Sequence, residues 1–144
     1  MPHRAYTPWL LLSFLLFSFR VGAQLIQATF PTLFLPPFER WYSGALGYDW
    51  LVCAQLLILL LMAFIIRGFA RGTTKPTRLF GRWLLILGLL YFLAMAFRLV
   101  IGLAVASNHP WFGALIPALF HLVLASFMML VGHFHYRGGG SRVE

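Results

Sequence analysis

Acidic residues are almost missing from this chain, which has 3 aspartates and glutamates among its 144 residues, against 11 lysines and arginines. Charged residues of both signs make up 10% of the chain and apolar residues 61%, whereas soluble domains carry about 25% charged and about 45–50% apolar residues. So few charges could not keep a surface dispersed in water, but a lipid environment requires none. With a mean hydropathy of +0.85, the composition predicts an integral membrane protein.

The shortage of acids also excludes a class of function. The acids are Glu39, Asp49 and Glu144, and none lies in the middle of an apolar stretch. Small proton-coupled multidrug transporters use a carboxylate inside the membrane as the proton carrier, and this chain has none there. A small anion transporter or channel stays open as an alternative function, because the charges that fall inside apolar stretches are positive.

Cysteine is equally scarce, and histidines are poorly spaced for metal binding. Cys53 is the only cysteine, so an internal disulfide, a Cys-x-x-Cys redox pair and a thiolate metal site are excluded. A haem held by two histidines needs both at matching depth in the membrane, and only His121 is deep. We expect no metal site and no haem within one chain, and no motif specific enough assigns a catalytic residue.

Four long apolar stretches are present, over residues 8–30, 49–66, 81–106 and 111–132. Each is close to the roughly 20 residues that a helix needs to cross about 30 Å of hydrocarbon. None shows the period of two that marks a barrel strand. The expected fold is all-α, an integral membrane four-helix bundle in which residues 1–144 form a single membrane domain. An aromatic outer loop over residues 31–48 and a basic loop over residues 67–82 connect the helices.

Lysines and arginines are distributed unevenly among the connections. Eight lie in the basic loop and the two tails: Arg4, Arg67, Arg71, Lys75, Arg78, Arg82, Arg137 and Arg142. The other two connections carry only Arg40. The positive-inside rule therefore predicts that the basic loop and both termini are cytoplasmic. This asymmetry explains the net charge of +8 without nucleic acid, for which a basic stripe with interleaved aromatics is missing.

The N-terminal segment has a second interpretation, because residues 1–23 also resemble a secretory signal peptide. His3 and Arg4 precede an apolar run, and small residues end it at Ala23. Cleavage before Gln24 would leave three helices and an external N-terminus. We favour an uncleaved first helix, because the apolar character resumes after Ala23 and Arg20 is unusual so close to a cleavage site.

Five polar side chains inside the predicted helices form the candidate ligand-binding site: Arg20, Gln24, Gln55, Arg98 and His121. Ionisable groups cost roughly 2.5–3.5 kcal/mol each at the middle of a membrane, so they call for an explanation. A rise of about 1.5 Å per residue places all five roughly 9–15 Å below the outer surface. We therefore expect one polar layer in the outer half of the membrane, with Gln27 on the same face of the first helix.

Two interpretations of this layer are open. In the first, Glu39, Asp49 and backbone carbonyls neutralise the arginines, the aromatic loop with Trp41 forms a lid, and the remaining polar groups bond between helices. In the second, the layer lines an outer-leaflet pocket. A lipid phosphate, a quinone carbonyl or a small acid would then supply the missing partner.

Several features resemble the DoxX-like group of small bacterial four-helix membrane proteins. They are Arg20 followed by Gly22, the long outer connection ending in Trp41-Tyr42-Ser43-Gly44, and the three further apolar stretches. The resemblance covers the topology and one short motif. It departs at Gln24 and Gln27, where the first helix of that group ends in His-Gly.

DoxX-like proteins are linked to respiratory quinone chemistry or redox-stress complexes, often as accessory subunits. The resemblance implies an accessory membrane subunit. Together with the polar side chains inside the helices, it leads us to expect a non-enzymatic bacterial inner-membrane protein, an accessory or scaffold subunit that binds partner helices or a lipid- or quinone-like ligand in an outer-leaflet polar pocket. Its partners would be membrane lipids, and a membrane protein complex or further copies of itself. The alternative functions are a redox protein that holds quinone or haem near His121 and Arg98, and the anion transporter or channel.

Overall fold

A computed structural model describes residues 2–139, and this part of the chain is helical without a strand. Its elements are α1 (Pro2–Thr29), α2 (Phe38–Trp41), α3 (Tyr48–Arg71), α4 (Arg78–Ala104) and α5 (Leu115–Gly138). All except the short α2 are long and apolar enough to cross a membrane. The expectation of an all-helical chain with four helices of membrane length is confirmed. Arg142 and Glu144 lie outside the described residues.

The helices differ from the apolar stretches at their ends. α3 continues through Arg67 to Arg71 and ends at Gly72, whose φ of 67° is left-handed. α5 begins at Leu115 rather than at residue 111, because the preceding residues form turns in which His109 Nδ1 accepts the backbone N–H groups of Trp111 and Phe112. Hydropathy finds the part of a helix that suits lipid, and the ends are set by turn and cap residues instead.

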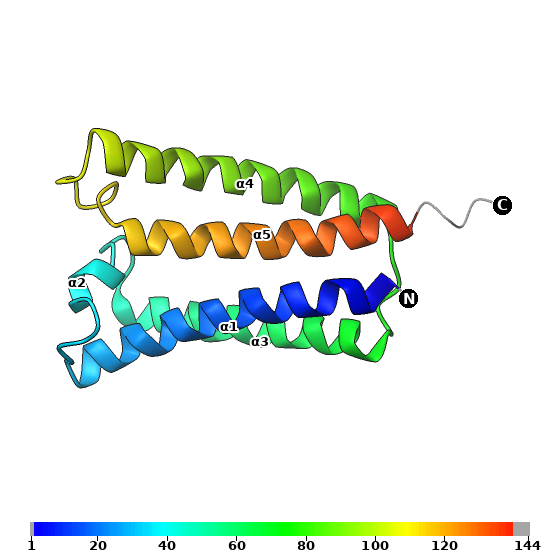
Figure 1. The fold of residues 1–144 in the computed structure, drawn as a ribbon, viewed down its shortest axis with the longest axis horizontal. Coiled ribbons are helices and arrows are strands. Elements are labelled where there is room, and N and C mark those ends of the chain that lie inside the picture. Colours follow the sequence, from blue (N-terminus) through cyan, green and yellow to red (C-terminus); the bar gives the residue numbers. More distant parts are fainter. Residues whose placement is uncertain (1, 140–144) are drawn as a thin grey trace.

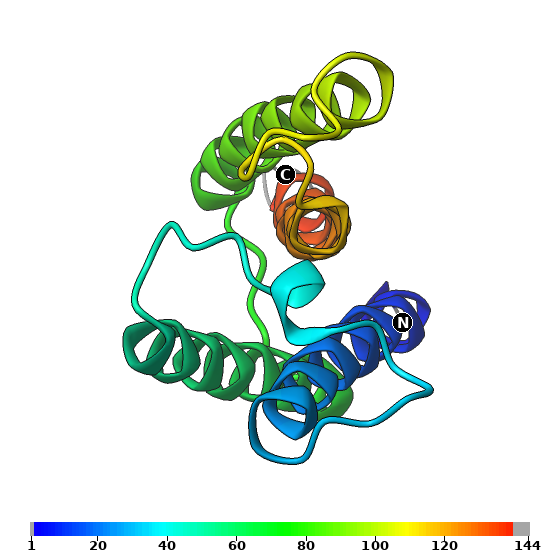
Figure 2. The same ribbon diagram turned by 90° about the vertical axis from the view of Figure 1, so that its left-hand side faces the viewer.

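The four long helices pack as two pairs (Figure 2). α4 packs along α5, α1 packs along α3, and a contact between α1 and α5 joins the pairs. Although α3 and α4 are consecutive, within residues 2–139 no Cα atom of α3 lies within 8 Å of one in α4 or α5. α2 contacts both α1 and α5, so it braces the two pairs.

The connections sort to opposite ends of the bundle (Figure 1). The start of α1, the end of α5 and the loop over residues 72–77 lie at one end, which we call the terminal end. α2 and the turn between α4 and α5 lie at the other, which we call the α2 end. The start of α1 and the end of α5 therefore lie at the same end of the bundle.

Aromatic side chains close the terminal end between α1, α3 and α5. The rings of Phe69 and Phe134 have centroids 4.6 Å apart, and Tyr6 packs edge-on against Phe134 at 5.5 Å. The Tyr6 hydroxyl and His133 Nδ1 share a hydrogen bond of 2.8 Å. Side chains alone therefore connect the last turns of α3 to α5. Along the rest of its length, α3 lies apart from α5.

Glycines allow α4 and α5 to approach closely. A Cβ atom added at Gly81 would lie 2.7 Å from the carbonyl oxygen of Gly132, and one at Gly132 would lie 2.9 Å from the backbone nitrogen of Leu85. Membrane helices associate mainly through van der Waals packing, so small residues at the crossing strengthen it. The α4–α5 pair is therefore the most closely packed part of the bundle.

We expect an added methyl group at this crossing to push α4 and α5 apart. We expect Gly81→Ala to lower the free energy of unfolding by about 1–3 kcal/mol, the usual cost of overpacking, because the atoms it meets belong to the backbone. Thermal unfolding in detergent, followed by circular dichroism, measures the change. Gly22→Ala in α1 is the matched control, since nothing lies within 4 Å of a Cβ atom there. Equal melting temperatures for the two variants would contradict the close crossing.

Candidate functional site

Arg20 connects α1 to α2 inside the bundle. Its side chain is 5% exposed, and its Nη2 donates a hydrogen bond of 3.2 Å to the carbonyl oxygen of Trp41. Trp41 is itself 3% exposed, and its indole N–H donates to the carbonyl oxygen of Pro36 at 2.8 Å. The guanidinium thus meets the last carbonyl of α2, where a helix end carries partial negative charge.

Gln24 and Gln55 form an amide pair between α1 and α3. They are 0% and 3% exposed, and Gln55 Nε2 donates to Gln24 Oε1 at 3.2 Å. Gln24 Nε2 is buried and has no hydrogen-bond partner within the described residues. Amide contacts of this kind hold membrane helices together, because lipid offers no competing partner.

Gln27 holds the start of the aromatic loop through hydrogen bonds to its backbone. From the sequence alone, Gln27 is expected only on the same face of α1 as Arg20 and Gln24. Its Nε2 donates to the carbonyl oxygens of Thr32, Leu35 and Pro36 at 3.2, 3.1 and 2.7 Å. Its Oε1 accepts the backbone N–H of Thr32 at 2.6 Å. The signal that could have found it is the proline-rich loop itself, whose carbonyls need donors that prolines cannot supply.

Arg98 makes the matching contact on the other helix pair. It is 3% exposed, and its Nε and Nη2 donate to the carbonyl oxygen of Trp111 at 3.2 and 2.8 Å. Its guanidinium carbon also lies 4.2 Å from the centroid of the Trp111 ring. Trp111, which follows α4 in the turn before α5, therefore supplies both a carbonyl acceptor and a π face.

His121 joins α5 to α4 near the same level. Its Nδ1 shares a short hydrogen bond with the hydroxyl of Tyr91, and the two rings meet edge-on with centroids 5.8 Å apart. His121 lies within range of the positive charges of both Arg98 and Arg20. The structure thus places polar side chains of α1, α3, α4 and α5 toward the α2 end, and we call Arg20, Gln24, Gln55, Arg98 and His121 the polar layer.

The carboxylates that were expected as counterions stand apart from this layer. Glu39 and Asp49 are exposed, and within residues 2–139 neither forms a salt bridge. The buried guanidiniums contact the carbonyl oxygens of Trp41 and Trp111 instead. A carbonyl carries only a partial charge, so the polar layer keeps a net positive charge in a region of low dielectric constant.

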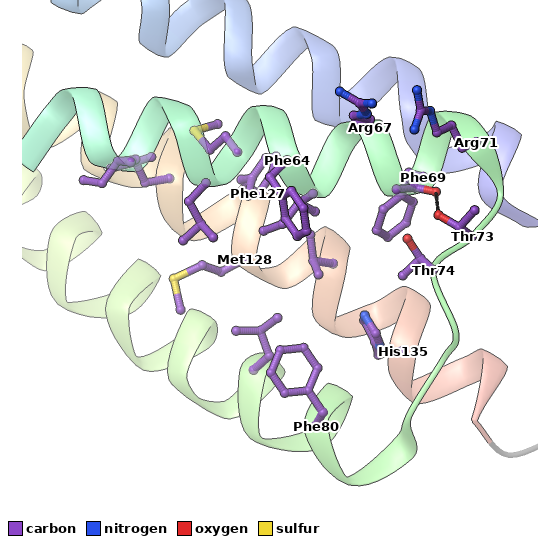
Figure 3. Close-up of a pocket in the computed structure, with 18 of the residues that line it drawn as sticks. Phe64, Arg67, Phe69, Arg71, Thr73, Thr74, Phe80, Phe127, Met128 and His135 are labelled. Carbon is purple, nitrogen blue, oxygen red and sulfur yellow. Dashed lines mark hydrogen bonds between the residues drawn. The ribbon is translucent and has the colours of Figure 1, made fainter.

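A large cleft separates α3 from the α4–α5 pair (Figure 3). Its volume is about 780 Å³, within the range of roughly 300–1,000 Å³ that small-molecule sites occupy. One wall consists of α3 side chains between residues 58 and 71. Phe80, Leu84 and Tyr91 of α4 and side chains between residues 124 and 135 of α5 form the other. We call this the lateral cleft.

The lateral cleft is apolar along its length and polar at its ends. Toward the α2 end it reaches Tyr91, the partner of His121. At the terminal end it is lined by His135 and Thr74 and by further polar residues of the α3 end: Arg67, Arg71 and Thr73. From Phe80 to Tyr91 the helical rise gives a length of roughly 17 Å, about half of the roughly 30 Å of hydrocarbon in a bilayer.

The predicted site residues and the lateral cleft are therefore different places. No member of the polar layer lines the cleft, and the two meet only through the bond between Tyr91 and His121. Two polar groups that line the cleft could bind a neutral cofactor: Tyr91 at the end nearer the α2 end, and His135 at the terminal end. Within residues 2–139, no group of three His, Cys, Asp or Glu side chains could hold a metal ion.

Comparison of the chain with protein-family models, with curated proteins and with solved structures finds no match. Its function is therefore argued from the geometry.

The contact of Arg98 with Trp111 can be tested by a conservative change. Lysine cannot make the forked, stacked contact of a guanidinium, so we expect Arg98→Lys to cost about 1.5–3 kcal/mol of stability, the usual value for hydrogen bonds to charged groups. Unfolding by titration with a denaturing detergent measures it. Arg82→Lys, at an exposed position of the same helix, should change stability little, and a similar loss in both variants would argue against a specific role.

The carboxylates should contribute little to stability. We expect Glu39→Gln and Asp49→Asn each to leave the free energy of unfolding within about 0.5 kcal/mol of the parent, as is usual for surface substitutions, because both side chains are exposed. The same detergent titration applies. A loss as large as that of Arg98→Lys would show that the carboxylates do neutralise the buried arginines.

Proposed function

We propose that this chain is a non-enzymatic bacterial inner-membrane protein, an accessory or scaffold subunit that holds a lipid-like ligand in the lateral cleft. The positive-inside rule puts the terminal end, with its lysines and arginines, in the cytoplasm. The lateral cleft then lies in the cytoplasmic half of the membrane and the polar layer in the other half. The observation that carries the proposal is the separation of α3 from α4 and α5, which leaves an apolar space beside a polar rim.

The cleft opens to the surroundings of the bundle. Phe64 and Leu61, which line it from α3, are 75% and 58% exposed, and Phe80 on the opposite wall is 52% exposed. In a membrane such side chains face acyl chains. Water would gain few hydrogen bonds in a space lined this way, so a hydrocarbon chain is the occupant that fits its chemistry.

The length of the cleft favours a lipid chain. From Phe80 to Tyr91 it runs roughly 17 Å, about half of the roughly 30 Å of hydrocarbon in a bilayer. An acyl or isoprenoid chain of one leaflet can extend over that length.

The polar layer has a positioning role in this proposal. Arg20 holds the end of α2 on α1, and α2 contacts α5 as well. The α2 end is thereby braced across the two helix pairs, while the terminal end is tied by Phe69 and Phe134. The space between these two ties is the lateral cleft.

A quinone is a second candidate occupant, which would make the chain a redox subunit. One observation favours a quinone: Tyr91 lines the cleft at the end nearer the α2 end, and its hydroxyl shares a hydrogen bond with His121. A tyrosine–histidine pair can donate a hydrogen bond to a carbonyl oxygen. The mass of the occupant distinguishes a quinone from a phospholipid.

The proposal is tested by filling the cleft. We expect native mass spectrometry of the chain, released from phosphatidylcholine nanodiscs, to show one retained lipid per chain. Leu61→Trp places an indole in the cleft and should reduce retention about tenfold, equivalent to ~1.4 kcal/mol. Leu60→Trp is the matched control, because Leu60 is a neighbouring exposed leucine that does not line the cleft.

Retention that is unchanged in Leu61→Trp would refute lipid binding in the cleft. Purification from native membranes supplies a further check. A stoichiometric protein partner that occupies the cleft, with no retained lipid, would favour binding of a partner helix instead.

A further inference from the structure

His135 presents a hydrogen-bond donor at the terminal end of the lateral cleft. Its side chain is 9% exposed, and its Nδ1 accepts the backbone N–H of Thr77 at 3.1 Å. A ring nitrogen that accepts is not protonated, so the proton of a neutral imidazole lies on Nε2. Within residues 2–139 this Nε2 has no protein acceptor. His135 also lines the cleft, so its donor is available to a ligand.

The loop opposite His135 is held in place and adds a hydroxyl group. His3 Nε2 bonds to the carbonyl oxygen of Thr74 at 2.9 Å, and Thr77 bonds to His135 as described. Figure 3 shows Thr74 and His135 near one another at this end of the cleft. An imidazole N–H and a threonine hydroxyl on fixed backbone can together donate to the oxygens of one phosphate group.

The charge around this end is positive. The described basic residues here are Arg4, Arg67, Arg71, Lys75, Arg78, Arg82 and Arg137. The acids among residues 2–139 are Glu39 and Asp49, and both are near the α2 end. Figure 3 shows the side chains of Arg67 and Arg71 on the side of α3 opposite Thr74 and His135. Their charge therefore acts on a head group at the rim through space, and not by direct contact.

We infer that the lateral cleft selects an anionic glycerophospholipid of the cytoplasmic leaflet, an inference that rests on the proposed function. One acyl chain lies along the cleft toward Tyr91. The phosphate is bonded by His135 Nε2 and the Thr74 hydroxyl, and the basic rim stabilises its negative charge. The basic rim attracts a zwitterionic lipid less strongly, because the ammonium group of that lipid neutralises the charge of its phosphate.

The test compares two head groups on the same acyl chains. Nanodiscs contain equal amounts of phosphatidylcholine and phosphatidylglycerol, and native mass spectrometry identifies the retained lipid. We expect phosphatidylglycerol to be enriched about fivefold or more over phosphatidylcholine, since each basic residue near a membrane surface contributes appreciably. Arg71→Gln should reduce the enrichment while the total retained lipid stays close to that of the parent. Arg40→Gln, at the α2 end, is the control and should leave the enrichment unchanged.

A second pair of variants tests the bound phosphate. His135→Asn keeps an acceptor near the Nδ1 position for Thr77 but removes the Nε2 donor, and should weaken retention of both lipids. His133→Asn is the control, because His133 bonds to Tyr6 and does not line the cleft.

The outcomes separate this inference from the proposed function. Equal retention of the two lipids by the parent chain, or full retention of both by His135→Asn, would overturn the anionic site and leave lipid binding intact. Absence of any retained lipid would overturn the proposed function as well.

Discussion

Two arginines are buried in this bundle, where neither forms a salt bridge within residues 2–139, and each needs a hydrogen-bond acceptor. Arg20 takes the carbonyl oxygen of Trp41 and Arg98 that of Trp111. Both acceptors belong to segments between the long helices, so those segments must fold back onto the bundle at the α2 end. In hydrocarbon an unsatisfied backbone or guanidinium group costs several kcal/mol, which makes these contacts the constraint on which the α2 end depends.

The rest of the architecture follows from how this end is braced. α2 contacts both α1 and α5, and the glycines of α4 and α5 bring that pair into close contact. α3 pairs only with α1 along its length and meets α5 through aromatic side chains near residue 69. The lateral cleft is the consequence, since α1 contacts α5 while α3 stays apart from α4 and α5 except at its last turns. Its apolar walls, its polar ends and the positive charge around the terminal end together define what could bind there.

Sequence reasoning located the four long helices because length and apolar composition are sufficient to recognise a membrane span. It also expected Arg20, Gln24 and Gln55 in one polar layer, because a polar group in lipid must find a partner, and that this layer binds a ligand stays a prediction. One of its two interpretations gave the arginines backbone carbonyls as partners, together with Glu39 and Asp49. It could not say which carbonyls, since backbone groups leave no mark in a sequence. The lateral cleft was out of reach for a different reason. A space between helices is an absence of contact, and the leucines and phenylalanines that line it are indistinguishable in sequence from those that face lipid.

In the proposed function a lipid chain, and not a protein side chain, occupies the space between α3 and the α4–α5 pair. Methionine methyl groups report on this directly, because Met128 lines the cleft and Met129 does not. In lipid nanodiscs, nuclear Overhauser spectra of methyl-labelled protein should show cross-peaks from Met128 to lipid chain methylenes. Leu61→Trp should weaken these and leave the cross-peaks of Met129 unchanged. Cross-peaks from Met128 to α3 side chains, with none to lipid, would mean that the helix pairs close on one another and that the cleft does not exist in the membrane.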